Sequence, residues 1–184
     1  MAKYNIEAIV LKKISYGDAD RIYTLLTKDK GKITAVARGV RKISSRRGGN
    51  LDTLNHINIT LSENTSGYKT ITEVKTLGSY RNLKKSLECS LAGYYMAELI
   101  NKSVEENSEN NDVFFLLRDS LDTLDADGKK KKFVVNKFEF LLMKLLGYEM
   151  SLNELRSFKK EELDNRLKLY VKESLGEDFK SLTI

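Results

Sequence analysis

Residues 38–50 contain glycines near both ends and no acidic residue. Five cationic side chains occupy ten consecutive positions of this segment. The five are Arg38, Arg41, Lys42, Arg46 and Arg47. Glycine lets a backbone turn and approach a ligand closely, and arginine supplies planar donors that match phosphate oxygens. Ser44 and Ser45 can donate to the same oxygens without reading base sequence. The segment therefore predicts a loop that binds the backbone of a polyanion, with a solvated run of surface charge as the alternative.

The net charge of +6 is unevenly distributed along the 184 residues. Residues 1–81 hold 15 Lys and Arg against 7 Asp and Glu, whereas residues 82–184 hold 17 against 19. A basic excess confined to one half is typical of a protein in which one module meets an anion. Arg21 and Lys32 extend this basic set to the predicted strands that flank the loop, where ordinary surface charge explains them equally well.

Aromatic side chains give a weaker signal for nucleic-acid binding. Single strands commonly stack their bases on aromatic rings, but no Phe precedes Phe114 and the chain has no Trp. Tyr23 belongs to an apolar segment and is predicted to be core, while Tyr16 and Tyr68 stand beside turn glycines and are expected to be exposed. We therefore expect binding that depends on the phosphate backbone and tolerates any sequence.

Enzymatic sites are poorly supported. Asp18 and Asp20 are two residues apart in a predicted turn, where aspartate is common as a capping residue. His56 is the only histidine and is predicted to be a solvated strand residue; Cys89 is the only cysteine, so neither a disulfide within the chain nor a cysteine-based zinc site is expected. With no phosphate-binding glycine loop either, we expect a cytoplasmic, non-enzymatic protein that needs no cofactor and does not insert into a membrane.

The surrounding pattern predicts an α+β protein of two domains, residues 1–80 and residues 81–184. Short apolar or alternating runs predict strands over residues 7–13, 21–27, 32–38, 56–61 and 68–74. Gly31 is available for the positive-φ position of the hairpin between the second and third strands. Five strands with no long helix between them favour a small barrel, and the oligonucleotide-binding (OB) type fits this count.

From residue 82 the apolar residues recur at helical spacing instead. Residues 82–104 are predicted as one amphipathic helix, and a second helix follows Asp112. Residues 125–132 are predicted to form a solvated loop that carries a second basic run, residues 129–132. Residues 133–146 are predicted as the central helix of an all-α bundle that ends at Gly147, and a last helix is expected around residues 161–175.

Several of these segments, in this order, resemble the bacterial RecO family of recombination mediators. They are residues 6–11, 16–22 and 26–33, the loop residues 37–42 and 45–51, and, more weakly, residues 138–148 and 169–182. The resemblance implies an OB barrel followed by a helical domain. It also implies binding of single- and double-stranded DNA, annealing of complementary strands and help in loading recombinase, with RecR and single-strand-binding protein as partners in a nucleoid-associated role. The DNA-binding residues expected on this basis are Arg38, Arg41, Lys42, Ser45, Arg46 and Arg47, with Arg21 and Lys32 beside them.

The chain departs from the family pattern in one respect. Many RecO proteins carry a four-cysteine zinc site after the central helix, whereas residues 149–168 of this chain contain neither cysteine nor histidine. A shortened helical domain without zinc keeps a rival open, an adaptor whose basic face binds acidic protein tails. A third possibility is an RNA-binding barrel, since OB folds bind either nucleic acid.

Overall fold

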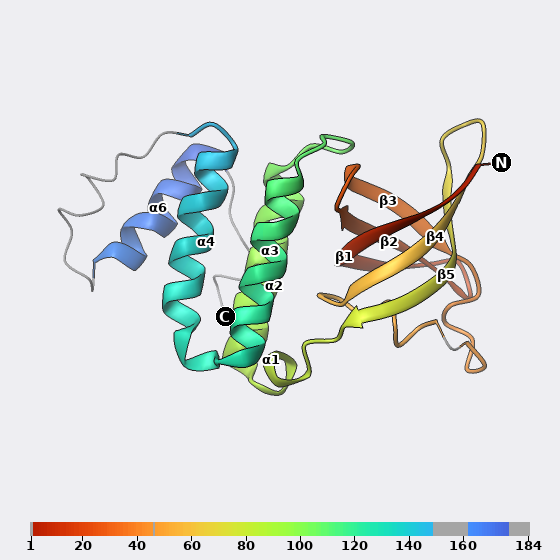
Figure 1. Cartoon of the computed structure of the whole chain (residues 1–184), viewed down its shortest axis with the longest axis horizontal. Coiled ribbons are helices and arrows are strands. Elements are labelled where there is room, and N and C mark those ends of the chain that lie inside the picture. The colour runs from red at the N-terminus through yellow and green to blue at the C-terminus, as the bar shows by residue number, and fades with distance from the viewer. Residues whose placement is uncertain (1, 46, 149–161, 177–184) are drawn as a thin grey trace. The chain divides into compact units, whose positions relative to one another are not determined.

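The first 80 residues form a closed five-stranded barrel in the computed structural model, which describes residues 2–45, 47–148 and 162–176 (Figure 1). The strands are β1 (Ala2–Tyr16), β2 (Asp20–Thr27), β3 (Gly31–Ala37), β4 (His56–Glu63) and β5 (Lys69–Gly78). They close in the order β1-β2-β3-β5-β4. The pairs are antiparallel except for β3 and β5, which run parallel and pair at Val36 and Thr70. A small five-stranded barrel is the OB architecture, so the predicted fold class is confirmed.

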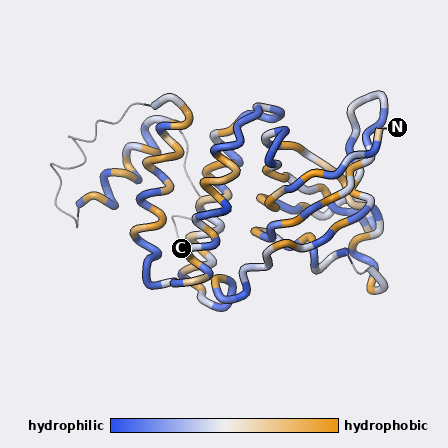
Figure 2. The backbone as a smooth tube through the Cα atoms, in the orientation of Figure 1, coloured by the Kyte–Doolittle hydropathy of each residue, from blue (hydrophilic) through white to orange (hydrophobic). Residues whose placement is uncertain are grey.

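Alternation along the strands explains why they close around one core. Ile6, Ala8 and Val10 of β1 point inward with Ile57, Ile59 and Leu61 of β4, while the residues between them face outward. The tube in Figure 2 alternates in hydropathy along the strands accordingly. Tyr23 is fully buried in this cluster, as predicted. Gly31 adopts φ +62° in the β2–β3 hairpin, which confirms the role expected of it.

Residues 104–114 pack with the barrel as part of the first compact unit, although helical residues precede and follow them. The Asn107 amide donates to the Lys32 carbonyl at 2.8 Å, and the Thr34 hydroxyl donates to Glu106 Oε1 at 2.7 Å. At β4 the His56 ring meets the Phe114 ring edge to face, with 5.9 Å between centroids, and contacts the Glu7 carboxylate at 2.6 Å. The prediction of a solvated His56 was therefore wrong, because this distant segment covers its outer face.

The second compact unit comprises residues 81–103 and 115–184. Its described helices are α1 (Arg81–Lys85), α2 (Leu87–Ser103), α3 (Asn111–Ala126, whose first residues belong to the barrel unit), α4 (Lys131–Leu145) and α6 (Leu163–Leu175). A short 3₁₀ turn (Gly128–Lys130) precedes α4. No helix among the described residues combines the length and apolar character needed to cross a bilayer. The division into domains 1–80 and 81–184 stays a prediction.

Two details of the helical unit differ from the sequence prediction. The single helix predicted over residues 82–104 is broken at Ser86, whose hydroxyl accepts from the Cys89 amide at 3.3 Å and so caps the start of α2. The predicted loop over residues 125–132 is largely helical, because the Asp127 side chain accepts from the Lys129 amide and starts the 3₁₀ turn that leads into α4.

Helix α4 has six buried residues, and α2 has eight. Val134, Phe138, Leu142 and Met143 are buried, as expected of a central helix, although Phe133 at its start is exposed. The helix stops at Gly147, which has φ +85° and donates to the Lys144 carbonyl, so the predicted C-terminal stop is confirmed.

Candidate nucleic-acid interface

Residues 38–55, which connect β3 to β4, form the candidate site; we call residues 38–50 the basic loop. Its start is fixed to the β1–β2 turn by three hydrogen bonds. The Gly39 amide donates to Asp20 Oδ1 at 2.7 Å, and the Arg41 amide donates to the Ala19 carbonyl at 2.9 Å. Arg41 Nη1 also donates to the Gly17 carbonyl at 3.1 Å. Gly39 has φ +65°, a conformation that a residue with a Cβ adopts only with strain.

Arg47 holds the other side of the basic loop to the barrel. Its Nη1 donates to the carbonyls of Ile71 (3.0 Å) and Thr72 (3.3 Å) in β5, and its Nη2 donates to the Arg38 carbonyl (2.8 Å). These carbonyls follow the paired residues Val36 and Thr70 of the parallel strands β3 and β5. The guanidinium therefore supplies hydrogen-bond donors to both chain segments beyond that pair. Because its donors are engaged by backbone, Arg47 serves as a brace for the loop.

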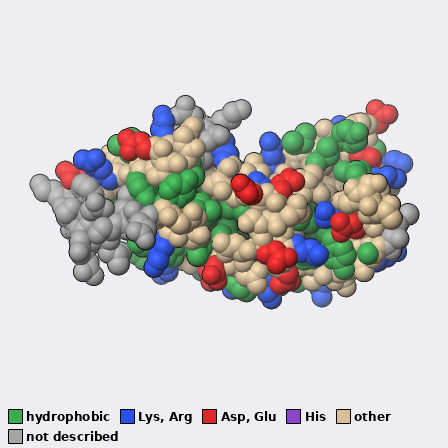
Figure 3. Space-filling view, turned by 90° about the horizontal axis from the view of Figure 1, so that it is seen from above, with side chains coloured by type: hydrophobic (Ala, Val, Ile, Leu, Met, Phe, Trp, Pro, Cys, Tyr) green, Lys and Arg blue, Asp and Glu red, His purple; other side chains and the backbone are tan. Residues whose placement is uncertain are grey.

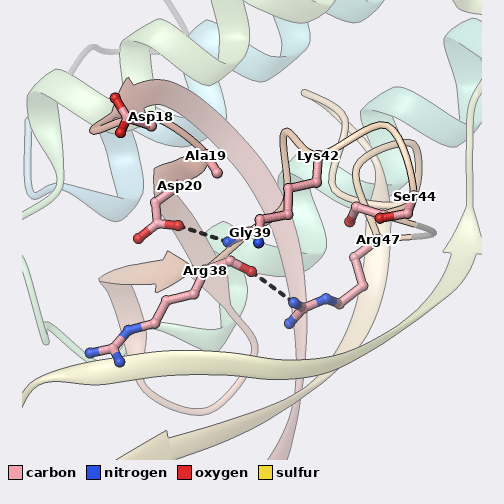
Figure 4. Close-up of a pocket in the computed structure, with 9 residues that line it drawn as sticks. Asp18, Ala19, Asp20, Arg38, Gly39, Lys42, Ser44 and Arg47 are labelled. Carbon is pink, nitrogen blue, oxygen red and sulfur yellow. Dashed lines mark hydrogen bonds between the residues drawn. The ribbon is translucent and has the colours of Figure 1, made fainter.

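Arg38, Arg41 and Lys42 are exposed on the braced loop. Among the described residues, none of the three forms an ion pair. Arg38 and Lys42 border an open pocket of about 860 Å³ together with Ser44 and Ser45, and Asp18 and Asp20 line it as well. In Figure 4 the Arg38 side chain extends away from the Arg47 guanidinium, and the Asp20 carboxylate points to the Gly39 amide. Asp18 lies in the β1–β2 turn, whereas Asp20 is the first residue of β2. The Asp20 carboxylate accepts from the Gly39 amide of a distant loop instead of capping its own turn as predicted.

The other predicted site residues are less exposed than these three cations or lie outside the described residues. Ser45 is half-buried, with its amide bonded to the Lys42 carbonyl at 2.8 Å. Arg46 lies outside the described residues. Arg21 is half-buried in β2 beside the Tyr23 hydroxyl; burial raises the pKa of Tyr23, and the Arg21 guanidinium partly opposes that rise.

Lys32 lies apart from the loop. It is only 8% exposed, and burial lowers the pKa of its ammonium group, with nearby Glu106 acting in the opposite direction. A side chain so covered is poorly suited to meet a phosphate.

One face of the barrel carries charge of both signs. Figure 3, which views the molecule from above, shows Lys and Arg side chains interspersed with Asp and Glu on that face. That face therefore presents no broad field of one sign to a polyanion.

Sequence reasoning missed two exposed apolar side chains near the site, Ile43 and Ile14. Ile43 stands fully exposed inside the basic loop, and Ile14 in β1 is 48% exposed. For Ile14 a usable signal exists, since it lies two residues before Tyr16 and therefore on the same face of the strand. Tyr16, 57% exposed, and Tyr68, 41% exposed, match the expectation made for them.

A metal site of the four-cysteine kind does not fit this chain, because Cys89 is its only cysteine. Cys89 is buried in α2, with its thiol 3.8 Å from the Gly128 carbonyl. Within the described ranges, no group of three or more His, Cys, Asp or Glu side chains is placed to hold a metal ion.

The fold and the loop together define an OB-type barrel protein with a helical unit and a braced basic loop. The family model described as "Recombination protein O N terminal" matches residues 1–80, and that described as "Recombination protein O C terminal" matches residues 84–157. The chain belongs to the RecO family of DNA repair and recombination proteins.

Relatives of known name agree with this assignment. The DNA repair protein RecO of Dehalococcoides mccartyi is 33% identical over 173 residues, which cover 94% of this chain and 67% of the relative. That of a Roseiflexus species is 34% identical over 151 residues, which cover 82% of this chain and 52% of the relative. The DNA repair protein RecO of a Nocardioides species is 39% identical over 115 residues, which cover 62% of this chain and 47% of the relative. The chain thus spans about half to two thirds of the length of these relatives.

Proposed function

We propose that the chain is a non-enzymatic recombination mediator that binds single- and double-stranded DNA through its basic loop. The observation that carries the proposal is the group of three exposed cations, Arg38, Arg41 and Lys42, on a loop whose backbone is fixed from both sides. Neutralising phosphates with such cations releases counterions, which supplies most of the affinity of sequence-independent binding.

The fixed backbone supports the proposal because ordering a loop during binding costs conformational entropy. Arg47 and Asp20 already hold both sides of the loop in the free protein. The side chains of Arg38 and Lys42 then lose only their own rotamer freedom when a strand arrives. Ser45 adds a hydroxyl at the same pocket for a phosphate oxygen.

Annealing of complementary strands and assistance in recombinase loading are further parts of the proposal. Two complementary strands repel one another through their phosphates, and cations on one protein surface reduce that repulsion. Membership of the RecO family supports a role in DNA repair, with RecR and single-strand-binding protein as proposed partners.

The test uses fluorescence anisotropy to measure the binding of labelled oligonucleotides at low salt. We expect the chain to bind both single-stranded and duplex DNA. We also expect it to speed the annealing of a complementary, dye-labelled pair of strands. Absence of any DNA binding at low salt, together with capture of an acidic peptide, would favour the adaptor instead. Binding of RNA in clear preference to DNA of the same sequence would favour an RNA-binding barrel.

A further inference from the structure

Ile43 stands at the apex of a tight turn in the basic loop. The Ser45 amide donates to the Lys42 carbonyl at 2.8 Å, so Ile43 and Ser44 are the central residues of this turn. Turn centres favour Gly, Pro, Asn, Asp and Ser, because these residues preset the backbone or hydrogen-bond to it. Isoleucine does neither, and its β-branched side chain is stiff. Its side chain is nonetheless fully exposed at this position.

The exposure of Ile43 contrasts with the other aliphatic residues between β3 and β4. Residues 38–55 contain four of them, and the other three, Val40, Leu51 and Leu54, are buried. Val40 and Leu51 belong to the core cluster of the barrel. Their burial, together with the hydrogen bonds that brace the loop, fixes the backbone on both sides of Ile43. The isoleucine is therefore held out into solvent by an anchored loop.

Cations lie at the base of this apolar tip. Arg41 and Lys42, both exposed, directly precede Ile43 in the chain. Arg41 donates from one guanidinium nitrogen to the Gly17 carbonyl, and the guanidinium has further N–H donors for a ligand. The tip therefore suits a ligand that is anionic on its outside and apolar within.

The acids of the site line the pocket rather than the tip. Asp18 and Asp20 line the pocket together with Lys42 and Ser44. Ile43 is not among the described residues that line it. A ligand can therefore reach the Ile43 side chain without entering the pocket that contains the two carboxylates.

We infer that Ile43 is a wedge that inserts between two neighbouring base pairs of duplex DNA, while Arg41 and Lys42 bind phosphates beside the opened step. The inference rests on the proposed DNA-binding function and adds to it a contact with the interior of the duplex. Isoleucine is among the apolar side chains that open a base step in this way, and the opened step kinks the duplex. Burial of the side chain and the additional contacts of the kinked duplex offset the cost of opening.

The wedge selects duplexes that open easily. Mismatched pairs and pyrimidine–purine steps unstack at lower cost than an A-tract, which is stiff. Contacts to phosphates alone do not distinguish these duplexes by their bases. The site therefore gives a preference for deformable duplexes without any hydrogen bond to a base edge.

An anionic bilayer is the other ligand with charge outside and an apolar interior. Even a single myristoyl chain, which is far larger than one isoleucine side chain, gives only marginal and reversible membrane binding. Membership of a family of DNA repair proteins also favours the duplex. Phosphatidylglycerol vesicles serve as the competing ligand in the test.

The test measures binding of the unchanged chain and of Ile43→Ser to two duplexes of equal length and charge. One duplex contains a central mismatch beside a base analogue that fluoresces when unstacked, and the other is a uniform A-tract. We expect the unchanged chain to raise the fluorescence and to bind the mismatched duplex roughly 10-fold more tightly than the A-tract. Ile43→Ser should lose both effects, whereas Ile43→Leu should keep them.

Two controls accompany these measurements. Leu87→Ser, which removes an exposed leucine from α2 in the helical unit, is the matched variant and should behave as the unchanged chain. Ile43→Ser should bind single strands within about twofold of the unchanged chain, because phosphate contacts dominate that binding. Urea unfolding checks that Ile43→Ser is as stable as the unchanged chain, as expected for a fully exposed side chain.

The outcomes separate the wedge from DNA binding itself. If the unchanged chain binds both duplexes equally or leaves the fluorescence unchanged, the wedge is rejected while DNA binding stands. Equal weakening of single-strand and duplex binding in Ile43→Ser would also reject it, because the change would then act on the whole loop. Vesicle binding that disappears in Ile43→Ser, with duplex binding unaffected, would make the tip a membrane contact instead of a wedge. If the unchanged chain binds no DNA, both proposals are rejected.

Discussion

Each compact unit carries a run of cationic residues, and the two runs differ in how their side chains pair with acids. In the basic loop, Arg38, Arg41 and Lys42 are exposed and form no ion pair among the described residues. In the helical unit, Lys130 lies 3.6 Å from Asp127, and Lys131 lies 2.6 Å from Glu88. The lysine run, residues 129–132, also starts a helix, whereas the basic loop is held open by backbone hydrogen bonds. A lysine paired with an acid is less available to a phosphate, so Lys130 and Lys131 are poorer candidates for DNA contacts than the three loop cations.

The largest expected effect comes from removing the exposed charges of the basic loop. Arg38→Gln, Arg41→Gln and Lys42→Gln together should weaken DNA binding roughly 100-fold near 0.1 M salt, because three phosphate contacts are lost. Anisotropy titration measures the change, and urea unfolding checks that the fold survives. A variant that folds normally and binds DNA as well as the unchanged chain would remove the loop from the proposed interface.

A buried carboxyl group makes the helical unit respond to pH differently from the basic loop. Burial raises the pKa of Glu139 in α4 to about 7; Tyr95, whose hydroxyl donates to Oε1 at 2.5 Å, and Lys168 oppose the rise, and Asp164 adds to it. The folded state therefore binds this proton more tightly than the unfolded state does, and stability falls as pH rises from about 4.5 to about 7. The loss attributable to Glu139 is up to about 3 kcal/mol.

Urea unfolding of the unchanged chain and of Glu139→Gln across this pH range measures that contribution. The amide cannot ionise but still accepts from Tyr95, so the difference in stability between the two proteins should change with pH. Parallel curves at every pH would show that the carboxyl does not titrate as described.

Substitution of Arg47 distinguishes a structural role in the basic loop from a role in binding phosphates. Arg47→Met leaves three carbonyls without their donor and should lower the free energy of unfolding by about 2 kcal/mol. Arg47→Lys should recover only part of this, because one ammonium group does not reproduce the planar guanidinium. A stable Arg47→Met variant whose DNA binding becomes markedly less salt-dependent would instead make Arg47 a phosphate contact.

The smallest effect is expected from the lysine run. Lys129→Gln, Lys130→Gln and Lys132→Gln remove the same number of charges as the loop variant but should change DNA affinity less than twofold. The same anisotropy titration provides the comparison. A loss approaching that of the loop variant would mean that net charge, rather than placement, governs binding.

Much of the fold follows from local pattern, but the covering of His56 does not. The strands, the hairpin at Gly31 and the stop at Gly147 depend on alternation or on positive-φ glycines, which are visible in sequence. The covering of His56 by Phe114 depends on residues 58 positions apart, which no local pattern encodes.

The same limit applies to the site. The sequence identified the basic loop but could not distinguish Arg47, which contacts backbone carbonyls of β5, from its exposed neighbours. Asp20 was predicted to cap its own turn, while its bond to Gly39 depends on how the barrel closes.

The salt dependence of single-strand binding tests the central claim most directly. The logarithm of affinity should fall linearly with the logarithm of salt concentration, and the slope should be smaller by about 2 in the variant carrying Arg38→Gln, Arg41→Gln and Lys42→Gln, since each phosphate contact contributes about 0.7. Identical slopes for the two proteins would contradict the account, because the exposed cations of the loop would then release no counterions on binding.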